Sequence, residues 1–123
     1  MALTEEPIYI QEPTPLQCGQ AVLAMLSGES VETVIKTVET ERETTLKQML
    51  LFLEKYGIKF KRERIEVKER SQLPPICMLS LETPKCWHWS LYFKGKFFAP
   101  EYGVLDDFPP CRRRYYWEII EEG

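Results

Sequence analysis

The sequence lacks the features of membrane-spanning, secreted and metal-chelating proteins. Its longest apolar run, Ala21 to Leu26, is far too short to cross a bilayer. The segment Met1 to Pro7 is acidic and has no apolar core, so we expect no signal peptide. There is one histidine, and the four cysteines form no C-x-x-C pair, so no familiar zinc-ligand pattern is present. We therefore expect a cytoplasmic protein with reduced thiols, no metal and no organic cofactor.

An excess of positive charge is also absent. Acidic residues number 19 and basic residues 16, which gives a formal net charge of −3. This balance is not typical of a protein whose main partner is nucleic acid. The basic cluster Arg112 to Arg114 could contact an acidic partner, although three neighbouring charges more often form a solvated surface. We expect a peptide or protein as substrate or partner, and neither nucleic acid nor a membrane.

The chain does contain enough apolar material for one folded domain. Its 123 residues are 44% hydrophobic and include 3 Trp, 6 Tyr and 6 Phe. This length is typical of a single domain, and the composition is sufficient to bury a core without disulfides. We therefore predict one domain that covers residues 1–123.

Three helices are predicted in the first half of the chain. The first is apolar on nearly every face, so it should be buried in the middle of the domain. The second and third have apolar stripes at i, i+3, i+4 and i+7 and polar N-caps at Ser30 and Thr45. The predicted ranges are 17–26, 31–38 and from 46 to a stop at Gly57.

After the third helix the apolar period shortens to two residues, which predicts strands. Lys94-Gly95 is typical of a hairpin turn. The predicted strands cover 8–10, 58–67, 76–81, 87–93, 96–98 and 115–120. Helices followed by antiparallel strands predict an α+β fold, in which the N-terminal helix that carries Cys18 packs centrally on an antiparallel sheet.

Cys18 is the first candidate for a functional residue because it lies at the start of the first predicted helix. The unpaired N–H groups and the dipole of a helix start favour the thiolate, which is the nucleophilic form. We expect Gly19 to leave room for a substrate carbonyl, and the same N–H groups could bind an oxyanion. A buried structural cysteine is the competing interpretation of Cys18 alone.

His88 is the second candidate, because it is the only side chain whose unperturbed pKa lies near neutrality. Strand alternation puts Trp87 and Trp89 on one sheet face and His88 on the other. From there His88 could face the first helix and accept the proton of Cys18. The competing interpretation is a half-buried histidine that bonds to the backbone.

The cysteine and histidine segments together resemble one protein family. The matching segments, in order, are Gln11–Gly28, Trp87–Trp89, Gly95–Lys96 and Pro100–Gly103. They resemble small bacterial and phage papain-like cysteine peptidases, which are related to the double-glycine leader peptidases of bacteriocin exporters. The resemblance covers about residues 8–103. It implies a papain-like fold with Cys18 as nucleophile and His88 as general base.

The position of the third catalytic residue departs from the family pattern. Relatives carry an aspartate or asparagine just after the histidine hairpin, and the matching residue here is Ala99. Ala99 cannot accept the second imidazole proton, so activity could be attenuated. Glu101, Asp106 or Asp107 could substitute, although none occupies the matching position.

The position of the oxyanion donor departs as well. Relatives place a glutamine about six residues before the cysteine, and here that position is Glu12, whose carboxylate would repel a developing oxyanion. We therefore expect Gln11 to supply the donor, with Gln17 as the alternative.

Two functions from different classes fit these residues. The first is a cysteine hydrolase that cuts a peptide or amide bond through a thioester at Cys18. The second is a catalytically inactive papain-like module that binds another protein. Its candidate surface combines Arg112 to Arg114 with the aromatic residues 115–117, a mixture common at interfaces. Those aromatic residues would equally form a closing strand of the core.

Overall fold

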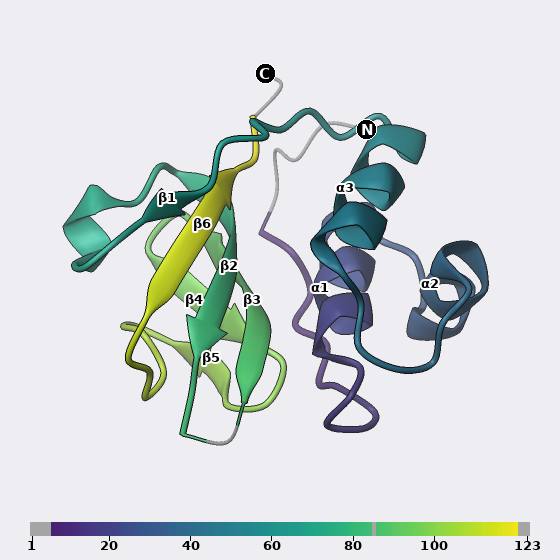
Figure 1. The fold of residues 1–123 in the computed structure, drawn as a ribbon, viewed down its shortest axis with the longest axis horizontal. Helices are drawn as coiled ribbons and strands as arrows, with labels where there is room; N and C mark the ends of the chain where they lie inside the picture. Colours follow the sequence, from purple (N-terminus) through teal and green to yellow (C-terminus); the bar gives the residue numbers. More distant parts are fainter. Residues whose placement is uncertain (1–5, 85, 121–123) are drawn as a thin grey trace.

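The computed structural model describes residues 6–84 and 86–120, which form three α-helices followed by a six-stranded antiparallel sheet (Figure 1). The helices are α1 (Cys18–Ser27), α2 (Val31–Val38) and α3 (Leu46–Lys55), and a short 3-10 helix, η1, covers Arg70–Gln72. The strands are β1 (Ile65–Glu66), β2 (Ile76–Glu82), β3 (Trp87–Phe93), β4 (Lys96–Ala99), β5 (Gly103–Leu105) and β6 (Arg114–Glu118). Their order in the sheet is β1-β6-β2-β3-β4-β5. The predicted α+β class is confirmed.

Helices α2 and α3 begin at their predicted N-caps, and α1 ends at its predicted glycine. The Ser30 side chain accepts a hydrogen bond from the backbone N–H of Thr33, and Thr45 and Gln48 form a reciprocal capping box. Helix α1 ends at Gly28, whose φ of 80° lies in the left-handed region that glycine adopts readily. All ten residues of α1 are buried, as expected for a central helix.

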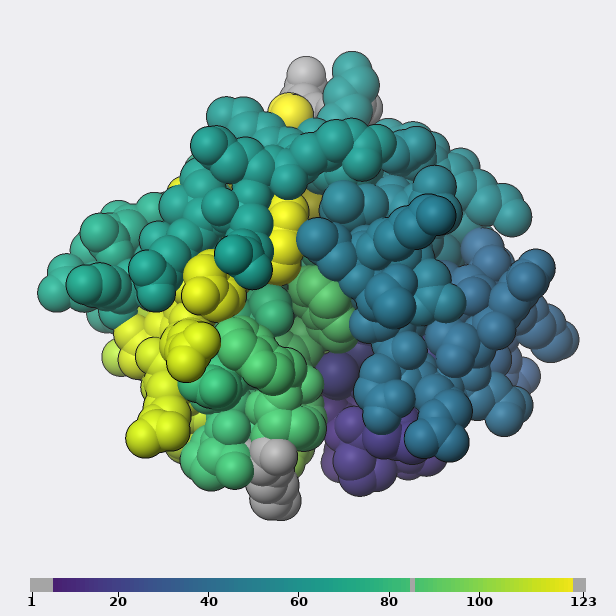
Figure 2. All heavy atoms as spheres, in the orientation of Figure 1, coloured from purple at the N-terminus to yellow at the C-terminus, as the bar shows by residue number. Residues whose placement is uncertain are grey.

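The sheet has a separate apolar cluster on each face. The larger cluster contains side chains of α1 and α3 together with Met78, Leu91 and Trp117 from the sheet. The smaller one lies on the opposite face and contains Leu79 and Phe97. Figure 1 shows the helices gathered on one side of the sheet, and the space-filling view shows the segment before α1 (purple) where the helical layer and the sheet meet (Figure 2). Packing between these two layers therefore determines the position of the N-terminus of α1.

The structure corrects several of the predicted strands. Residues 8–10 form no strand, and the predicted strand 58–67 is interrupted. Its described strand is β1 alone, and the residues around Phe60 pair with the end of β6 through an isolated bridge to Ile119 and two backbone hydrogen bonds. Most side chains of this stretch are charged and exposed. Its alternation of apolar and charged residues therefore marks an extended segment at the edge of the sheet rather than a fully paired strand. Strand β5 was not predicted, and β6 runs from Arg114 to Glu118 instead of 115–120.

The hairpin between β3 and β4 positions the histidine. The predicted turn at Lys94-Gly95 is confirmed, with φ values of 43° and 96° that suit a two-residue hairpin turn. It pairs Phe93 with Lys96, and the same register continues along both strands. After β4 the chain turns at residues 100–102, and β5 pairs back on β4 through Ala99 and Gly103.

The described residues include no helix that is long and apolar enough to cross a membrane. All four cysteines are free thiols, and Cys86 is the one most exposed to solvent.

Candidate active site

Cys18 is the first residue of α1 and lies at the junction of the two layers. Its side chain is almost buried, with 7% of the residue surface exposed. The Cys18 Sγ accepts a hydrogen bond from the backbone N–H of Trp89 on β3, at 3.4 Å. This bond ties the start of α1 to the strand that carries His88.

Two glutamines at the start of α1 hold the loop that leads into α3. The Nε2 of Gln20 donates to the carbonyls of Thr40 and Arg42, at 3.1 and 2.7 Å. The Nε2 of Gln17 donates to the carbonyl of Glu41 at 3.1 Å. The Gln17 amide, the alternative oxyanion donor of the sequence analysis, is therefore engaged by this loop.

Gly19 allows the same loop to pack closely against α1. A Cβ atom at residue 19 would lie 1.8 Å from Thr44 Oγ1 and 3.0 Å from Trp89 Cδ1. The Trp89 Nε1 also donates to the Thr44 carbonyl at 3.3 Å. The space beside Gly19, expected to admit a substrate carbonyl, is thus filled by the Thr44 side chain.

His88 lies among three ionisable side chains. Its Nε2 is 2.7 Å from Glu101 Oε2 and 3.2 Å from Cys86 Sγ. Its Nδ1 is 4.0 Å from Glu12 Oε1. Only 6% of the imidazole is exposed, so these side chains, rather than solvent, form most of its surroundings.

Cys18 and His88 line the same pocket, which has a volume of about 400 Å³. Its walls include Thr44 and the two tryptophans Trp87 and Trp89. Trp89 packs in the cluster shared with the helices, so the tryptophan face of β3 is the one that meets the helical layer. The prediction that the His88 face of this strand meets the first helix is therefore wrong, although His88 reaches the same pocket as Cys18. Among the described residues, Cys18 and His88 form no direct hydrogen bond.

Glu101 supplies a carboxylate near His88, whereas Ala99, which occupies the position of the acidic or amide residue in the resembled family, cannot. Ala99 is buried, and its carbonyl accepts a hydrogen bond from the Tyr9 hydroxyl at 2.7 Å. Glu101 lies two residues further, in the turn between β4 and β5, where the Tyr102 N–H donates to the Ala99 carbonyl at 3.0 Å. This turn brings the Glu101 carboxylate to His88, and no pattern in the sequence distinguishes Glu101 from the other two acidic candidates.

The segment before α1 presents Glu12, rather than Gln11, to the imidazole. Only 7% of the Glu12 side chain is exposed, and its backbone N–H donates to the Pro100 carbonyl at 3.1 Å. Gln11 is exposed on the same segment. The carboxylate of Glu12 is therefore part of the site, and its charge affects Cys18.

The environment of Cys18 disfavours the thiolate. Burial, with smaller contributions from the charges of Glu12 and Cys86, raises the pKa of Cys18 from 9.0 to about 11. The backbone N–H groups of Trp89 and Gly19 act in the opposite direction and only partly compensate. The expected thiolate at the helix start is thus corrected: at neutral pH Cys18 is a neutral thiol.

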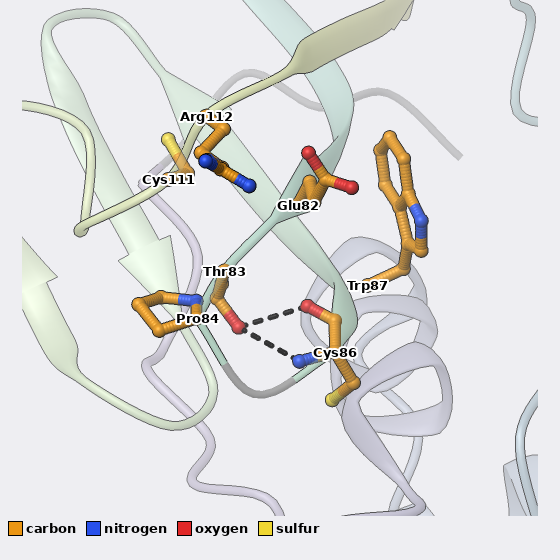
Figure 3. Close-up of a pocket in the computed structure, with 7 residues that line it drawn as sticks. All are labelled: Glu82, Thr83, Pro84, Cys86, Trp87, Cys111 and Arg112. Atoms are coloured by element: carbon orange, nitrogen blue, oxygen red, sulfur yellow. Dashed lines mark hydrogen bonds between the residues drawn. The ribbon is translucent and has the colours of Figure 1, made fainter.

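Strand β6 contains the aromatic part of the candidate partner surface. Tyr116 and Trp117 are buried, one in each apolar cluster, so they form a core strand. Arg113 pairs with Glu82 at 3.6 Å, and Arg112 is exposed beside a second pocket of about 570 Å³ (Figure 3). Of this predicted surface, Arg112 and Arg113 are therefore exposed, and Arg114 and Tyr115 are half-buried.

The chain was compared with family models, curated proteins and solved structures, and none of them matches it. The resemblance to papain-like peptidases therefore depends on the segments quoted above and on the site geometry.

Proposed function

We propose that this protein is a cytoplasmic papain-like cysteine hydrolase that cleaves a peptide or amide bond through a thioester on Cys18. The observation that carries the proposal is the 2.7 Å contact between His88 Nε2 and Glu101 Oε2, in a pocket shared with Cys18. The negative charge of a carboxylate beside Nε2 favours the tautomer with its proton on that nitrogen, which leaves Nδ1 as the acceptor for the thiol proton. Glu101 thereby takes the role that Ala99 cannot fill.

The neutral thiol of Cys18 makes His88 a general base rather than a partner in a preformed ion pair. As Sγ attacks the substrate carbonyl, the thiol proton passes to Nδ1 of His88 and a carbon–sulfur bond forms. The first N–H groups of α1 would bind the oxyanion. The proton then passes to the leaving amine, and water hydrolyses the thioester with His88 again as base.

The pocket supports a peptide substrate. It is open to solvent between the loop before α1 and the start of β3, and the walls that the tryptophans form suit apolar or aromatic contacts. Gln11 stays the predicted side-chain donor to the oxyanion, and comparing Gln11→Ala with Glu12→Gln distinguishes the two positions.

Covalent labelling with peptide-derived electrophiles tests the proposal. Peptidyl acyloxymethyl ketones should label Cys18, located by mass spectrometry, in a chelator-containing reducing buffer. Labelling should be lost in Cys18→Ser and slowed at least about tenfold in His88→Ala and Glu101→Gln, since a faulty orienting residue costs up to about 10⁴ in related triads. Cys111→Ser is the matched control and should label normally. Labelling of Cys18 at equal rates in His88→Ala, Glu101→Gln and their parent would refute a role for His88 and Glu101.

The raised pKa of Cys18 and the nearby charge of Glu12 favour a second candidate, a non-catalytic binding module. In this case no peptide electrophile would label Cys18 faster than iodoacetamide does. Binding of a partner protein would then survive Cys18→Ser and be lost on charge reversal of the accessible Arg112.

A further inference from the structure

Two carboxylates and the imidazole meet in a largely buried cluster. One donor atom each from Glu12, His88 and Glu101 lie within 4.8 Å of one another. Glu101 Oε2 is 2.7 Å from His88 Nε2, and Glu12 Oε1 is 4.0 Å from His88 Nδ1. The exposed fractions of the side chains are 7% for Glu12, 6% for His88 and 22% for Glu101. Residue spacing does not reveal this set, because the three residues match no familiar ligand motif.

The backbone holds the two carboxylates close together. The N–H of Glu12 donates to the carbonyl of Pro100, the residue before Glu101, at 3.1 Å. The Tyr9 hydroxyl donates to the carbonyl of Ala99 at 2.7 Å, which adds a second link between the same two segments. The segment before α1 is thus fixed to the turn that carries Glu101. Two carboxylates in one buried site repel each other, so this arrangement favours a cation beside both of them.

The imidazole offers a nitrogen to such a cation. The buried Nδ1 of His88 makes no hydrogen bond within residues 6–84 and 86–120. A buried polar atom in this state is costly unless a ligand satisfies it. The other ring nitrogen, Nε2, has Cys86 Sγ at 3.2 Å, but Cys86 lies outside the group of three donors.

The donor types and their separations suit a divalent transition-metal ion. Carboxylate oxygens and imidazole nitrogens bind Zn²⁺ at about 2.0–2.2 Å, so two ligands of one ion lie no more than about 4.4 Å apart. Small side-chain movements would bring the three donors to such distances. Imidazole suits Zn²⁺ and carboxylates suit Mn²⁺, and either ion balances the charge of two carboxylates. We infer that Glu12, His88 and Glu101 bind one divalent transition-metal ion, whose remaining positions are open to water.

A metal ion at this position would switch off the proposed hydrolase. In that reaction Nδ1 of His88 accepts the proton of Cys18. An ion on Nδ1 occupies the lone pair that this step needs, and an ion on Nε2 leaves the imidazole proton on Nδ1. This consequence depends on the proposed function, whereas the binding of the metal does not.

Titration with Mn²⁺, followed by electron paramagnetic resonance, tests the site in the full, reduced and chelator-stripped chain. Mn²⁺ is the first probe because thiols such as Cys18 and Cys86 are poor ligands for it. We expect the signal of free Mn²⁺ to disappear until one ion is bound per chain. The bound ion should broaden the NMR signals of the His88 ring, and Zn²⁺ should displace it, since Zn²⁺ binds such sites more tightly.

Glutamine variants test the two carboxylates. Glu12→Gln and Glu101→Gln keep the shape of the side chain and each remove one charged ligand. Each should weaken Mn²⁺ binding at least about tenfold, because even the loss of a residue that only supports a ligand costs about 10–100-fold. Two matched controls should bind Mn²⁺ as the parent does: Glu66→Gln, which removes an exposed carboxylate, and Cys86→Ser, which removes the thiol beside His88.

The absence of saturable Mn²⁺ and Zn²⁺ binding, or binding that either glutamine variant leaves unchanged, would overturn the inference. The parent chain tests it without any substitution, because an ion bound elsewhere would leave the signals of the His88 ring sharp. The two proposals fail separately. Labelling of Cys18 in chelator without metal binding would leave the hydrolase intact, and metal binding without labelling would leave the metal site intact.

Discussion

Replacing Glu12 with glutamine is expected to make Cys18 more reactive. Burial is the main cause of the raised pKa of Cys18, and the Glu12 charge is the largest electrostatic contribution in the same direction. Glutamine keeps the shape of the side chain and removes the charge. It also places at residue 12 the amide that members of the resembled family carry at the matching position. The variant should therefore lower the pKa of Cys18 from its value of about 11.

The magnitude follows from the thiolate population. A neighbouring charge moves a pKa by about one unit or more, and one unit raises the thiolate fraction about tenfold at neutral pH. A less basic thiolate is intrinsically less nucleophilic, by about threefold per unit. Alkylation by iodoacetamide at pH 7.5 should consequently accelerate about threefold. Reaction with a peptide electrophile should gain more, because an amide at residue 12 can also donate to the oxyanion.

The assay is the rate of alkylation at Cys18, measured by mass spectrometry between pH 6 and about pH 11. Glu66→Gln is the matched control, since it removes one exposed acidic charge on β1, the edge strand opposite to β5. It should leave the rate unchanged. An unchanged or raised midpoint in Glu12→Gln would refute the electrostatic role of Glu12.

Two further predictions concern packing and pH. Gly19→Ala should lower the free energy of unfolding by about 1–3 kcal/mol in urea titrations, because its Cβ would lie 1.8 Å from Thr44 Oγ1, and Thr44→Ala in the same chain should recover part of the loss. The folded-state pKa of Cys18 is raised, so its stabilising contribution is fully present below pH 9 and is lost as pH rises to about 11. Relative to Cys18→Ala, the free energy of unfolding should fall by about 2.7 kcal/mol across that window, and a parallel pH dependence in both chains would contradict the assigned pKa.

The fold was largely predictable because its signals are local. Caps at Ser30 and Thr45 and the stop at Gly28 define the helices, and the Lys94-Gly95 turn defines the hairpin. The edges of the sheet were less predictable. Residues 58–67 alternate as a strand does, but pairing requires a partner strand, and β6 pairs with only part of this stretch.

The site was predictable in its residues and less so in its chemistry. Cys18 and His88 do line one pocket, but comparison with the family directed attention to Ala99 for the third residue. Glu101 lies instead in the turn between β4 and β5, and the path of this turn, which brings the carboxylate to His88, is not readable from residue spacing. The position of Cys18 at a helix start predicts a lowered pKa, whereas the pKa is raised in the folded protein. Desolvation and the Glu12 charge depend on packing, which no local pattern encodes.

Nitrogen NMR of the imidazole tests most directly whether Glu101 prepares His88 to act as a base. His88 is the only histidine, so its two ring nitrogens are assigned without ambiguity. In chelator-stripped protein above the imidazole pKa, we predict the tautomer protonated at Nε2, with a hydrogen-bonded proton that shifts in Glu101→Gln. The tautomer protonated at Nδ1, unaffected by Glu101→Gln, would contradict the proposed catalytic arrangement.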